Sequence, residues 1–418
     1  MKRKLNILIC VLFVGLLSGF CIAFWVLPDR AVSENENRTL RQLPTPTLSD
    51  CLNGSFTAAF TDYCSDQFPL RDECIRLAAT LDLALGRGES GGVLYGRNGQ
   101  QVRRLFNAYR SRTERAENTD YYDEAHVAAS LTALSALRER LAEQLGLRVA
   151  ALTAHMDVER LEAQGIPLTV LLAPRTVDVA TAAGYPSVLS DRLHEQVETG
   201  LATVPHIDMT PDFRARFAAG EYVMYRTDHH WTTGGAYLAY RALMETWGRG
   251  DEALSAGLFT VRRVEGFAGT TAARSGFPVQ NPDVLELWEP PWDTAYTVCT
   301  VTDGKQKPLL SGFVNEAYLT TRDKYGAFLD GTHRVITVEL TDADPLASAS
   351  RPRLLLARDS YASALIPFLA RHFDIVAVDL SGGMTDLSSL AAAYDCTSVL
   401  VLCNLENLVT SDCLRNVK

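Results

Sequence analysis

The chain has 418 residues, of which 47% are hydrophobic and 22% charged, a composition typical of a globular protein. Its formal net charge is −10, and the only basic run is Met-Lys-Arg-Lys at the start. This charge balance argues against a nucleic-acid partner, which would need a basic patch. The length allows one large domain or two of ordinary size.

The first 27 residues have the pattern of a membrane segment. Residues 5–27 carry no charge, and a helix of about 20 apolar residues spans the hydrocarbon core of a bilayer. We predict an uncleaved signal anchor rather than a cleaved signal peptide, because the apolar run is long and Cys21-Ile22-Ala23 is a poor cleavage site. Basic residues precede the span and acidic ones follow it, which predicts a single-pass cell-membrane protein with the bulk of its chain extracytoplasmic.

The cysteines predict neither a metal site nor a disulfide framework. Of the nine cysteines, Cys10 and Cys21 lie in the apolar segment, and the other seven match no zinc-binding spacing. The sequence leaves open whether two of Cys51, Cys64 and Cys74 form a disulfide. We predict no cofactor.

Three regions are expected along the chain: the anchor at 1–27, a polar stalk at 28–50 and an α/β domain at 51–418. The stalk is rich in proline and polar residues and has no periodicity. In the domain, five apolar runs predict buried strands at residues 168–172, 204–209, 353–357, 374–380 and 398–403. Helical stretches separate most of these runs. This alternation predicts a mostly parallel sheet covered on both faces. Residues from about 250 to 340 break the rhythm and are predicted to be an insertion, with a hairpin around Asp330-Gly331.

The stretch TDHHW, residues 227–231, is the first candidate for chemistry. A helix is expected to follow it, capped by Thr232 or Thr233 and ended by Gly248. In an extended loop, residues two apart project to the same side, so Asp228 and His230 come together. A carboxylate beside an imidazole can fix its tautomer and stabilise the imidazolium, as in a nucleophilic triad.

A nucleophile is expected at Ser360. An apolar strand, a short turn with Asp359 and Ser360, and an amphipathic helix are predicted in sequence over residues 354–373. A serine at such a turn is exposed at the carboxyl edge of a parallel sheet, and nearby backbone N–H groups can bind an oxyanion. Asn404 follows the last predicted strand and points to the same edge.

Other interpretations of these residues remain open. The TDHHW stretch can be a structural loop in which Asp228 caps the helix, or a metal site that uses His229 and His230. A serine at a helix start is more often structural than nucleophilic. Trp231 and Tyr361 are expected to be core or rim aromatics.

Five segments in order resemble the DHHW family of bacterial surface proteins: VSENENRTL (32–40), VLYGRNGQ (93–100), TDHHWTTGGAYLAYRAL (227–243), RDKYGAFLDGTH (322–333) and LLLARDSYASALIPFLARHF (354–373). More distantly, they resemble the SGNH-hydrolase-like domains of alginate O-acetylation proteins. The resemblance implies an SGNH-hydrolase-like, flavodoxin-like α/β/α sandwich with a central, mostly parallel sheet. It also implies Ser360 as nucleophile, His230 as base and Asp228 as the orienting carboxylate. The chain departs from the esterase pattern in having Arg358, not Gly, before Asp-Ser.

The predicted function is an extracytoplasmic, membrane-anchored O-acetyltransferase or acetylesterase that acts on a cell-surface polysaccharide. We expect the residues around the triad to contact substrate: His229, Trp231, Asp359, Tyr361 and Asn404. For a transferase, the resemblance suggests a membrane-bound O-acyltransferase as partner. The alternative is a non-catalytic cell-surface protein of the same fold that binds glycan or serves in envelope assembly. A metal hydrolase built on Asp228, His229 and His230 is the third interpretation.

Overall fold

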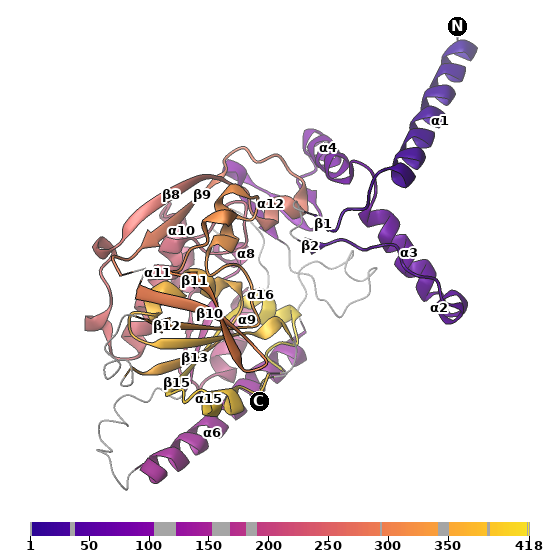
Figure 1. The fold of residues 1–418 in the computed structure, drawn as a ribbon. Coiled ribbons are helices and arrows are strands. Elements are labelled where there is room, and N and C mark those ends of the chain that lie inside the picture. Colours follow the sequence, from indigo (N-terminus) through magenta and orange to yellow (C-terminus); the bar gives the residue numbers. More distant parts are fainter. Residues whose placement is uncertain are drawn as a thin grey trace. The chain divides into compact units, whose positions relative to one another are not determined.

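The computed structural model describes residues 2–33, 38–103, 123–152, 168–180, 190–292, 295–341, 351–382, 385–415 and 417. By contacts the chain divides into two compact units (Figure 1). The first comprises residues 1–93 and 272–278, and the second comprises residues 94–271 and 279–418. The expected boundaries at residues 28 and 51 stay predictions.

The first unit is mainly helical. Its helices are α1 (Lys2–Val26), α2 (Leu48–Asn53), α3 (Ser55–Asp66) and α4 (Arg71–Ala84), with short strands β1 (Val32–Ser33), β2 (Arg38–Thr39) and β3 (Glu89–Ser90). Residues Lys4–Val26 of α1 are long and apolar enough to cross a membrane, a property that an anchor and a signal sequence share.

Part of the expected stalk is hydrogen-bonded to the end of α3. The side-chain amide of Gln67 donates to the carbonyl oxygens of Arg30 and Arg41, at 2.9 Å each. In return, the backbone N–H of Arg30 donates to Gln67 Oε1, and that of Arg41 donates to the Asp66 carboxylate. Polar residues around position 30 and position 41 are therefore folded onto a helix.

The second unit is built on an eight-stranded sheet in the order β11-β10-β12-β14-β13-β15-β6-β7. Its parallel part consists of β6 (Thr169–Ala173), β7 (His206–Asp208), β13 (Arg353–Arg358), β14 (Asp374–Asp379) and β15 (Ser398–Asn404). These are the five strands that the apolar runs predicted. The other three strands, β10 (Tyr296–Thr302), β11 (Lys305–Ser311) and β12 (Val335–Leu340), pair antiparallel. The predicted mixed α/β fold with a large, mostly parallel sheet is confirmed.

Alternate residues of the parallel strands bury their side chains in two different cores. In β13, Leu354 and Leu356 belong to one cluster, whereas Leu355 and Ala357 belong to the other. Because side chains of a strand alternate between faces, both faces of the sheet are covered, which explains the uninterrupted apolar runs.

Helices supply both covers (Figure 1). On one face lie α10 (Thr210–Ala218), α11 (Thr233–Thr246) and α14 (Ile366–Leu369), whose buried residues belong to the first cluster. On the other face lie α6 (Glu124–Leu152), α9 (Ser190–Gly200), α15 (Leu387–Ala393) and α16 (Leu405–Thr410). The helices α8 (Thr176–Val179) and α12 (Thr270–Ser275) are short, and β4 (Val93–Tyr95) and β5 (Gln101–Arg103) are neighbours in a small sheet.

The region between α11 and β13 does not fold as predicted around Asp330. Strands β8 (Thr260–Phe267) and β9 (Asp283–Glu289) form a sheet of their own, and β10 to β12 extend the large one. Residues Lys324–Ala327 form a 3-10 turn, η7, instead of the first strand of a hairpin. The predicted hairpin is wrong, because Leu329, Asp330 and Gly331 all have positive φ and turn the chain before β12 pairs with β10 and β14.

Candidate active site

The TDHHW residues form a tight loop held at both ends. Met224 and Trp231 make an isolated antiparallel bridge, and the Tyr225 N–H donates to the His230 carbonyl oxygen at 3.2 Å. After the loop, Thr232 caps α11 through its side chain, which accepts from the Gly235 N–H at 3.1 Å, as predicted. The loop is thereby fixed by backbone pairing on one side and a helix cap on the other.

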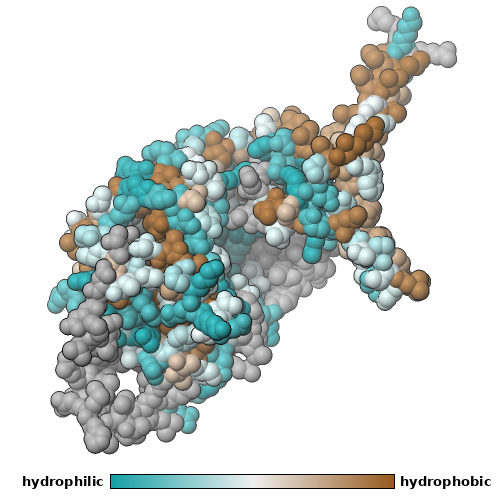
Figure 2. All heavy atoms as spheres, in the orientation of Figure 1, coloured by the Kyte–Doolittle hydropathy of each residue, from teal (hydrophilic) through white to brown (hydrophobic). Residues whose placement is uncertain are grey.

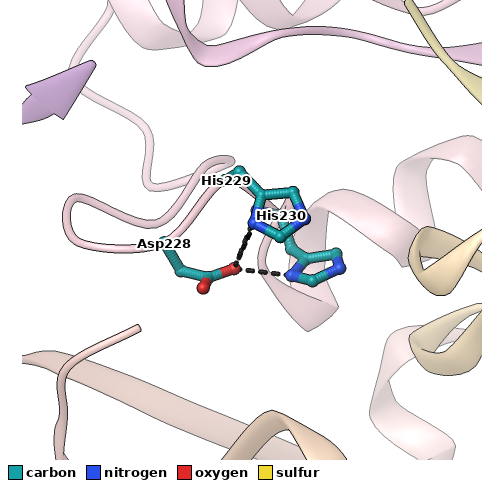
Figure 3. Close-up of side chains that lie close together, drawn as sticks. All are labelled: Asp228, His229 and His230. Atoms are coloured by element: carbon teal, nitrogen blue, oxygen red, sulfur yellow. Dashed lines mark hydrogen bonds and ion pairs between the residues drawn. The ribbon is translucent and has the colours of Figure 1, made fainter. Parts of the chain in front are cut away.

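Asp228 and His230 meet as the spacing predicts (Figure 3). Asp228 Oδ1 lies 2.5 Å from His230 Nδ1 and also accepts from the His230 backbone N–H at 2.9 Å. Its Oδ2 accepts from the backbone N–H and the hydroxyl of Thr270, at 2.7 and 3.0 Å. A Cβ on Gly269 would come within 2.2 Å of Oδ2, so this close approach requires glycine. The carboxylate is therefore enclosed by donors, with the side chain 1% exposed.

These surroundings keep Asp228 ionised. Burial alone raises the pKa of a carboxyl group. Here the adjacent imidazoles of His230 and His229, together with the hydrogen bonds from His230, outweigh burial, and the pKa of Asp228 lies well below its usual range. An ionised Asp228 accepts a hydrogen bond from the Nδ1–H of His230. This tautomer leaves Nε2 of His230 as the basic atom.

Ser360 completes the chain of contacts. It follows β13 and starts a 3-10 turn, η8 (Ser360–Ala364), and its Oγ lies 2.7 Å from His230 Nε2. The structure thus aligns Ser360, His230 and Asp228 in the order that a nucleophilic triad requires. The helix after the turn differs from the expectation: η8 and the four-residue α14 are short and almost entirely buried, so no long amphipathic helix points at Ser360.

Asp359 holds the turn that presents Ser360. Its Oδ1 accepts from the Tyr361 N–H at 3.0 Å, and its Oδ2 accepts from the Asn404 N–H and the Asn407 side-chain amide, at 2.6 and 2.9 Å. Burial raises the pKa of Asp359 despite these bonds. Both carboxylate oxygens are used, so we assign Asp359 to the support of the turn rather than to substrate contact.

Trp231 is a core aromatic, which is one of the two roles expected for it, and not a substrate contact. Its side chain has no exposed surface and lies in the core, where Nε1 donates to the Tyr361 carbonyl oxygen at 3.1 Å. A fully buried indole cannot contact a substrate. Trp231 instead joins the TDHHW loop to the turn that carries Ser360.

The other predicted residues surround a pocket beside the triad. His229, Tyr361 and Asn404 line it together with Arg103 and Glu406. Asn404 caps α16, accepting from the Glu406 N–H at 2.7 Å, and its amide donates to the Pro174 carbonyl oxygen. The carboxyl edge of the sheet therefore carries polar groups from β13 and β15, as expected.

Two residues near Ser360 were not assigned to the site from the sequence. The ring of Tyr325 in η7 stacks on the imidazole of His230, with ring centroids 3.9 Å apart and planes 10° from parallel. Arg358 is buried at the end of β13, where burial lowers its pKa, and its Nη2 donates to the His333 carbonyl oxygen. Tyr325 belongs to the RDKYGAFLDGTH segment, which was the only sequence signal for it.

Asp228, His229 and His230 could also hold a metal ion, since one ligand atom from each lies within 4.8 Å of the others. Both ring nitrogens of His230 already have partners, Asp228 on one side and Ser360 on the other. A metal bound there would have to displace one of these contacts. The hydrogen-bonded arrangement is the simpler account of the geometry.

Comparison with known proteins agrees with the resemblance. Residues 213–379 match the family described as DHHW protein, and residues 148–276 match the SGNH hydrolase-like domain, acetyltransferase AlgX. The resemblance predicted from the sequence is confirmed over these two segments of the chain. The chain is also 25% identical to "Probable alginate O-acetylase AlgJ" of Pseudomonas syringae pv. tomato over 243 residues, which is 58% of this chain. These residues span 52% of that relative, about half of its length.

Solved structures share the fold. A DHHW family protein from Eubacterium siraeum has a TM-score of 0.55 and 19% identity, with 78% of this chain and 96% of that chain covered. Bacillus cereus PatB1 has a TM-score of 0.57 and 17% identity, with 78% and 99% covered, and a second PatB1 structure carries a sulfonyl adduct. At this identity the likeness establishes the fold.

Proposed function

We propose that this protein is an extracytoplasmic, membrane-anchored serine acyl-transfer enzyme, an O-acetyltransferase or acetylesterase that acts on a cell-surface polysaccharide. The observation that carries the proposal is the Ser360 Oγ to His230 Nε2 contact of 2.7 Å, with His230 Nδ1 held by Asp228 on the opposite side of the ring. A serine is a weak nucleophile unless an adjacent base takes its proton. This contact supports His230 as that base.

The reaction has two steps. In the first, Ser360 Oγ attacks the acyl carbonyl, its proton passes to His230 Nε2, and collapse of the tetrahedral intermediate breaks the bond to the leaving alcohol, which takes that proton. In the second, a sugar hydroxyl or water attacks the acyl-enzyme, giving its proton to His230, and the bond to Ser360 Oγ breaks with return of the proton. The ionised Asp228 stabilises the imidazolium in both steps.

The oxyanion is expected to bind the backbone N–H of Ser360. The next two N–H groups, of Tyr361 and Ala362, already donate to the side chain and the carbonyl oxygen of Asp359. Among the described residues no acceptor is recorded for the Ser360 N–H. It is therefore the nearest backbone donor still available for developing negative charge.

The relatives support the proposed substrate, and the sequence resemblance suggests the partner. Similarity to a probable alginate O-acetylase supports acyl transfer to a polysaccharide, and α1 supports attachment to a membrane. If the protein transfers rather than hydrolyses, a membrane-bound O-acyltransferase would supply the acyl group. The acceptor is then a glycan at the cell surface.

The proposal is tested on the full-length protein in detergent. With p-nitrophenyl acetate, wild type should release a burst of p-nitrophenolate equal to the enzyme concentration, and Ser360→Ala and His230→Ala should each lose at least about 100-fold in acylation rate. A chelator should have no effect. A sulfonyl fluoride should label the Ser360 peptide of wild type, and the label should be much weaker in His230→Ala.

Two results would contradict it. Acylation that survives in Ser360→Ala would remove the serine mechanism, and loss of activity with chelator would favour a metal hydrolase. Wild type could instead give no burst and no sulfonyl labelling, while wild type and Ser360→Ala bind the same glycan. The protein is then the non-catalytic glycan-binding alternative.

A further inference from the structure

The pocket beside the triad contains one imidazole that the proposed mechanism does not use. The His229 ring lies 3.9 Å from the His230 ring, between centroids, and its side chain is 26% exposed. The backbone carbonyl oxygen of His229 accepts from the hydroxyl of Tyr361, the residue after Ser360. This bond holds the backbone of His229 against the turn that carries Ser360. Both His229 and Tyr361 line the pocket.

The hydrogen bonds around Thr270 determine which nitrogen of His229 carries the proton. Thr270 Oγ lies 3.0 Å from Asp228 Oδ2 and 2.7 Å from His229 Nδ1. An ionised carboxylate only accepts, so the single hydroxyl proton of Thr270 lies toward Asp228. Thr270 Oγ must then accept from His229 Nδ1–H. Nε2 of His229 is left as an acceptor, with no partner recorded in the part of the chain that the structure describes.

The electrostatic surroundings agree with a neutral His229. Burial and the adjacent His230 lower the pKa of His229 well below its usual value, although Asp228 acts in the opposite direction. At neutral pH the ring therefore presents a lone pair rather than a charge.

The cations of the pocket already have anionic partners. Arg103 Nη2 lies 3.0 Å from Glu406 Oε1, and Arg175 forms two bonds with Asp178, at 2.5 and 2.6 Å. A carboxylate ligand would have to compete with Glu406 or Asp178. A hydroxyl can donate to an acceptor nitrogen and leave both pairs intact.

We propose that His229 Nε2 accepts a hydrogen bond from a hydroxyl of a neutral sugar, beside the hydroxyl that receives the acyl group. His229 thus marks the acceptor subsite of the proposed transferase, which favours sugars with neighbouring free hydroxyls over uronates. The inference rests on the proposed function. It adds the chemical class of the acceptor and the atom that recognises it.

The test measures how the acyl-enzyme divides between glycan and water. The full-length protein is acylated with p-nitrophenyl acetate in the presence of a neutral hexose oligosaccharide, and acetylated sugar and free acetate are measured in the same sample. His229→Asn can still donate to Thr270 but lacks the atom at Nε2, so the ratio of sugar to water transfer should fall roughly three- to tenfold, the effect of one neutral hydrogen bond. His229→Gln places an acceptor near the Nε2 position and should retain most of the ratio.

Controls separate this proposal from the mechanism. His206→Asn changes a histidine outside the pocket and should match wild type, and an oligouronate of equal length should be a poorer acceptor than the neutral sugar. Equal ratios in wild type and His229→Asn, or a preference for the uronate, would overturn the acceptor assignment. A missing burst in wild type would instead overturn the serine mechanism.

An independent observation concerns the first unit. Six leucines of α2, of α4 and of the residues next to α4 have side chains that no described residue covers: Leu48 and Leu52 at 80% exposure, Leu70 and Leu77 at 62%, Leu81 at 55% and Leu85 at 72%. Leu77, Leu81 and Leu85 are four residues apart and lie along one side of α4, whereas Ala79 on the other side is 1% exposed. We call the four leucines in and next to α4, Leu70, Leu77, Leu81 and Leu85, the apolar collar. A protein that meets only water rarely exposes so many large apolar side chains together.

The collar is continuous with the apolar helix α1. Near the end of α1, Phe20 stacks on Phe68 with centroids 5.1 Å apart, and Phe24 contacts Tyr63 edge to face at 5.6 Å. Phe68 lies between α3 and α4, so the last turns of the candidate span pack on α3 and on the residues that lead into α4, which carries the collar. Figure 2 shows brown apolar surface along α1 and at the tip of α2.

We infer that the apolar collar lies in the surface of a lipid bilayer. Amphipathic helices bury an apolar face to about 5–10 Å in the boundary between head groups and acyl chains. A span that ends beside Phe68 would bring α4, which begins three residues later, to that depth. The ligand of this surface is therefore lipid, and α4 lies on the membrane that α1 enters.

The test is quenching of tryptophan emission by brominated lipid. The full-length protein with Leu81→Trp is placed in nanodiscs of plain or dibrominated phosphatidylcholine, and the emission of wild type is subtracted. The added emission of Leu81→Trp should be strongly quenched, whereas that of Arg76→Trp, on another side of α4, should change little. Equal emission of Leu81→Trp in the two lipids would overturn the inference, and the catalytic assays are unaffected by either outcome.

Discussion

The contact between Tyr325 and His230 is the individual interaction with the clearest consequence for catalysis. The phenol ring is 7% exposed and nearly parallel to the imidazole at 3.9 Å, so it limits the rotation of His230 about the axis that joins Asp228 and Ser360. An aromatic face also stabilises a cation above it, by about 0.5–2 kcal/mol. Tyr325 is bonded to the carbonyl oxygen of Ser360 and not to its Oγ. We therefore regard it as a positioning residue that acts through His230.

Replacement of Tyr325 separates stacking from the hydroxyl. Tyr325→Leu should lower the acylation rate roughly tenfold, because the imidazolium loses the aromatic face, while KM for the acyl donor stays within about twofold. Tyr325→Phe keeps the ring and loses only the bond to the Ser360 carbonyl oxygen, 3.3 Å long, so it should retain most of the rate. Burst kinetics measure both parameters. Equal losses in the two variants would assign the effect to the hydroxyl instead.

The link between α11 and the start of β14 is an ionisable contact outside the site. His372 Nε2 lies 2.8 Å from the Tyr240 hydroxyl, which already accepts from the Leu254 N–H, so the hydroxyl donates to an unprotonated Nε2. Burial lowers the pKa of His372 to about 4, and the charge of Arg249 adds to this. Arg351 and Arg371 act in the same direction, and Glu252 acts against it.

This contact predicts a loss of stability in acid. The pKa of His372 is about 6.5 in the unfolded chain and about 4 in the folded one, so between these values the unfolded state binds more protons. The free energy of unfolding should therefore fall as the pH drops from about 6.5 to about 4, by up to about 1.4 kcal/mol per unit of pKa difference. In thermal unfolding of the full-length protein, the Tm of His372→Gln should depend less on pH in this window than that of wild type. A steeper dependence in the variant would contradict the assignment.

In the second unit as a whole, the sheet gathers residues that are far apart in the chain. Ser360 and Asn404 come from the carboxyl ends of neighbouring parallel strands, β13 and β15. His230 arrives from a loop 130 residues before Ser360, and Tyr325 comes from a segment that lies between them in the sequence. Three antiparallel strands widen the sheet beside β14. The site thus depends on the assembled sheet, since no single segment contains it.

Residue types and their spacing were sufficient for the local features. The apolar runs predicted all five parallel strands, because a strand buried on both faces needs apolar residues at every position. The Asp-x-His spacing predicted the contact of Asp228 with His230, and Thr232 predicted the start of α11, because both interactions lie within a few residues. The parallel strands and the contact of Asp228 with His230 were accessible in this way, whereas Ser360 as nucleophile stays a prediction.

Interactions between distant segments could not be read from local pattern. The hydrogen bond of Trp231 to the turn that carries Ser360 depends on packing against Tyr361. The stacking of Tyr325 on His230 depends on the turn η7, in a region where a hairpin was predicted. Likewise, the free acceptor on His229 arises from Thr270, 41 residues later in the chain. Local sequence specifies which backbone conformations and faces are favourable, whereas the environment of each site residue is set by neighbours that only the packed core brings within a few ångströms.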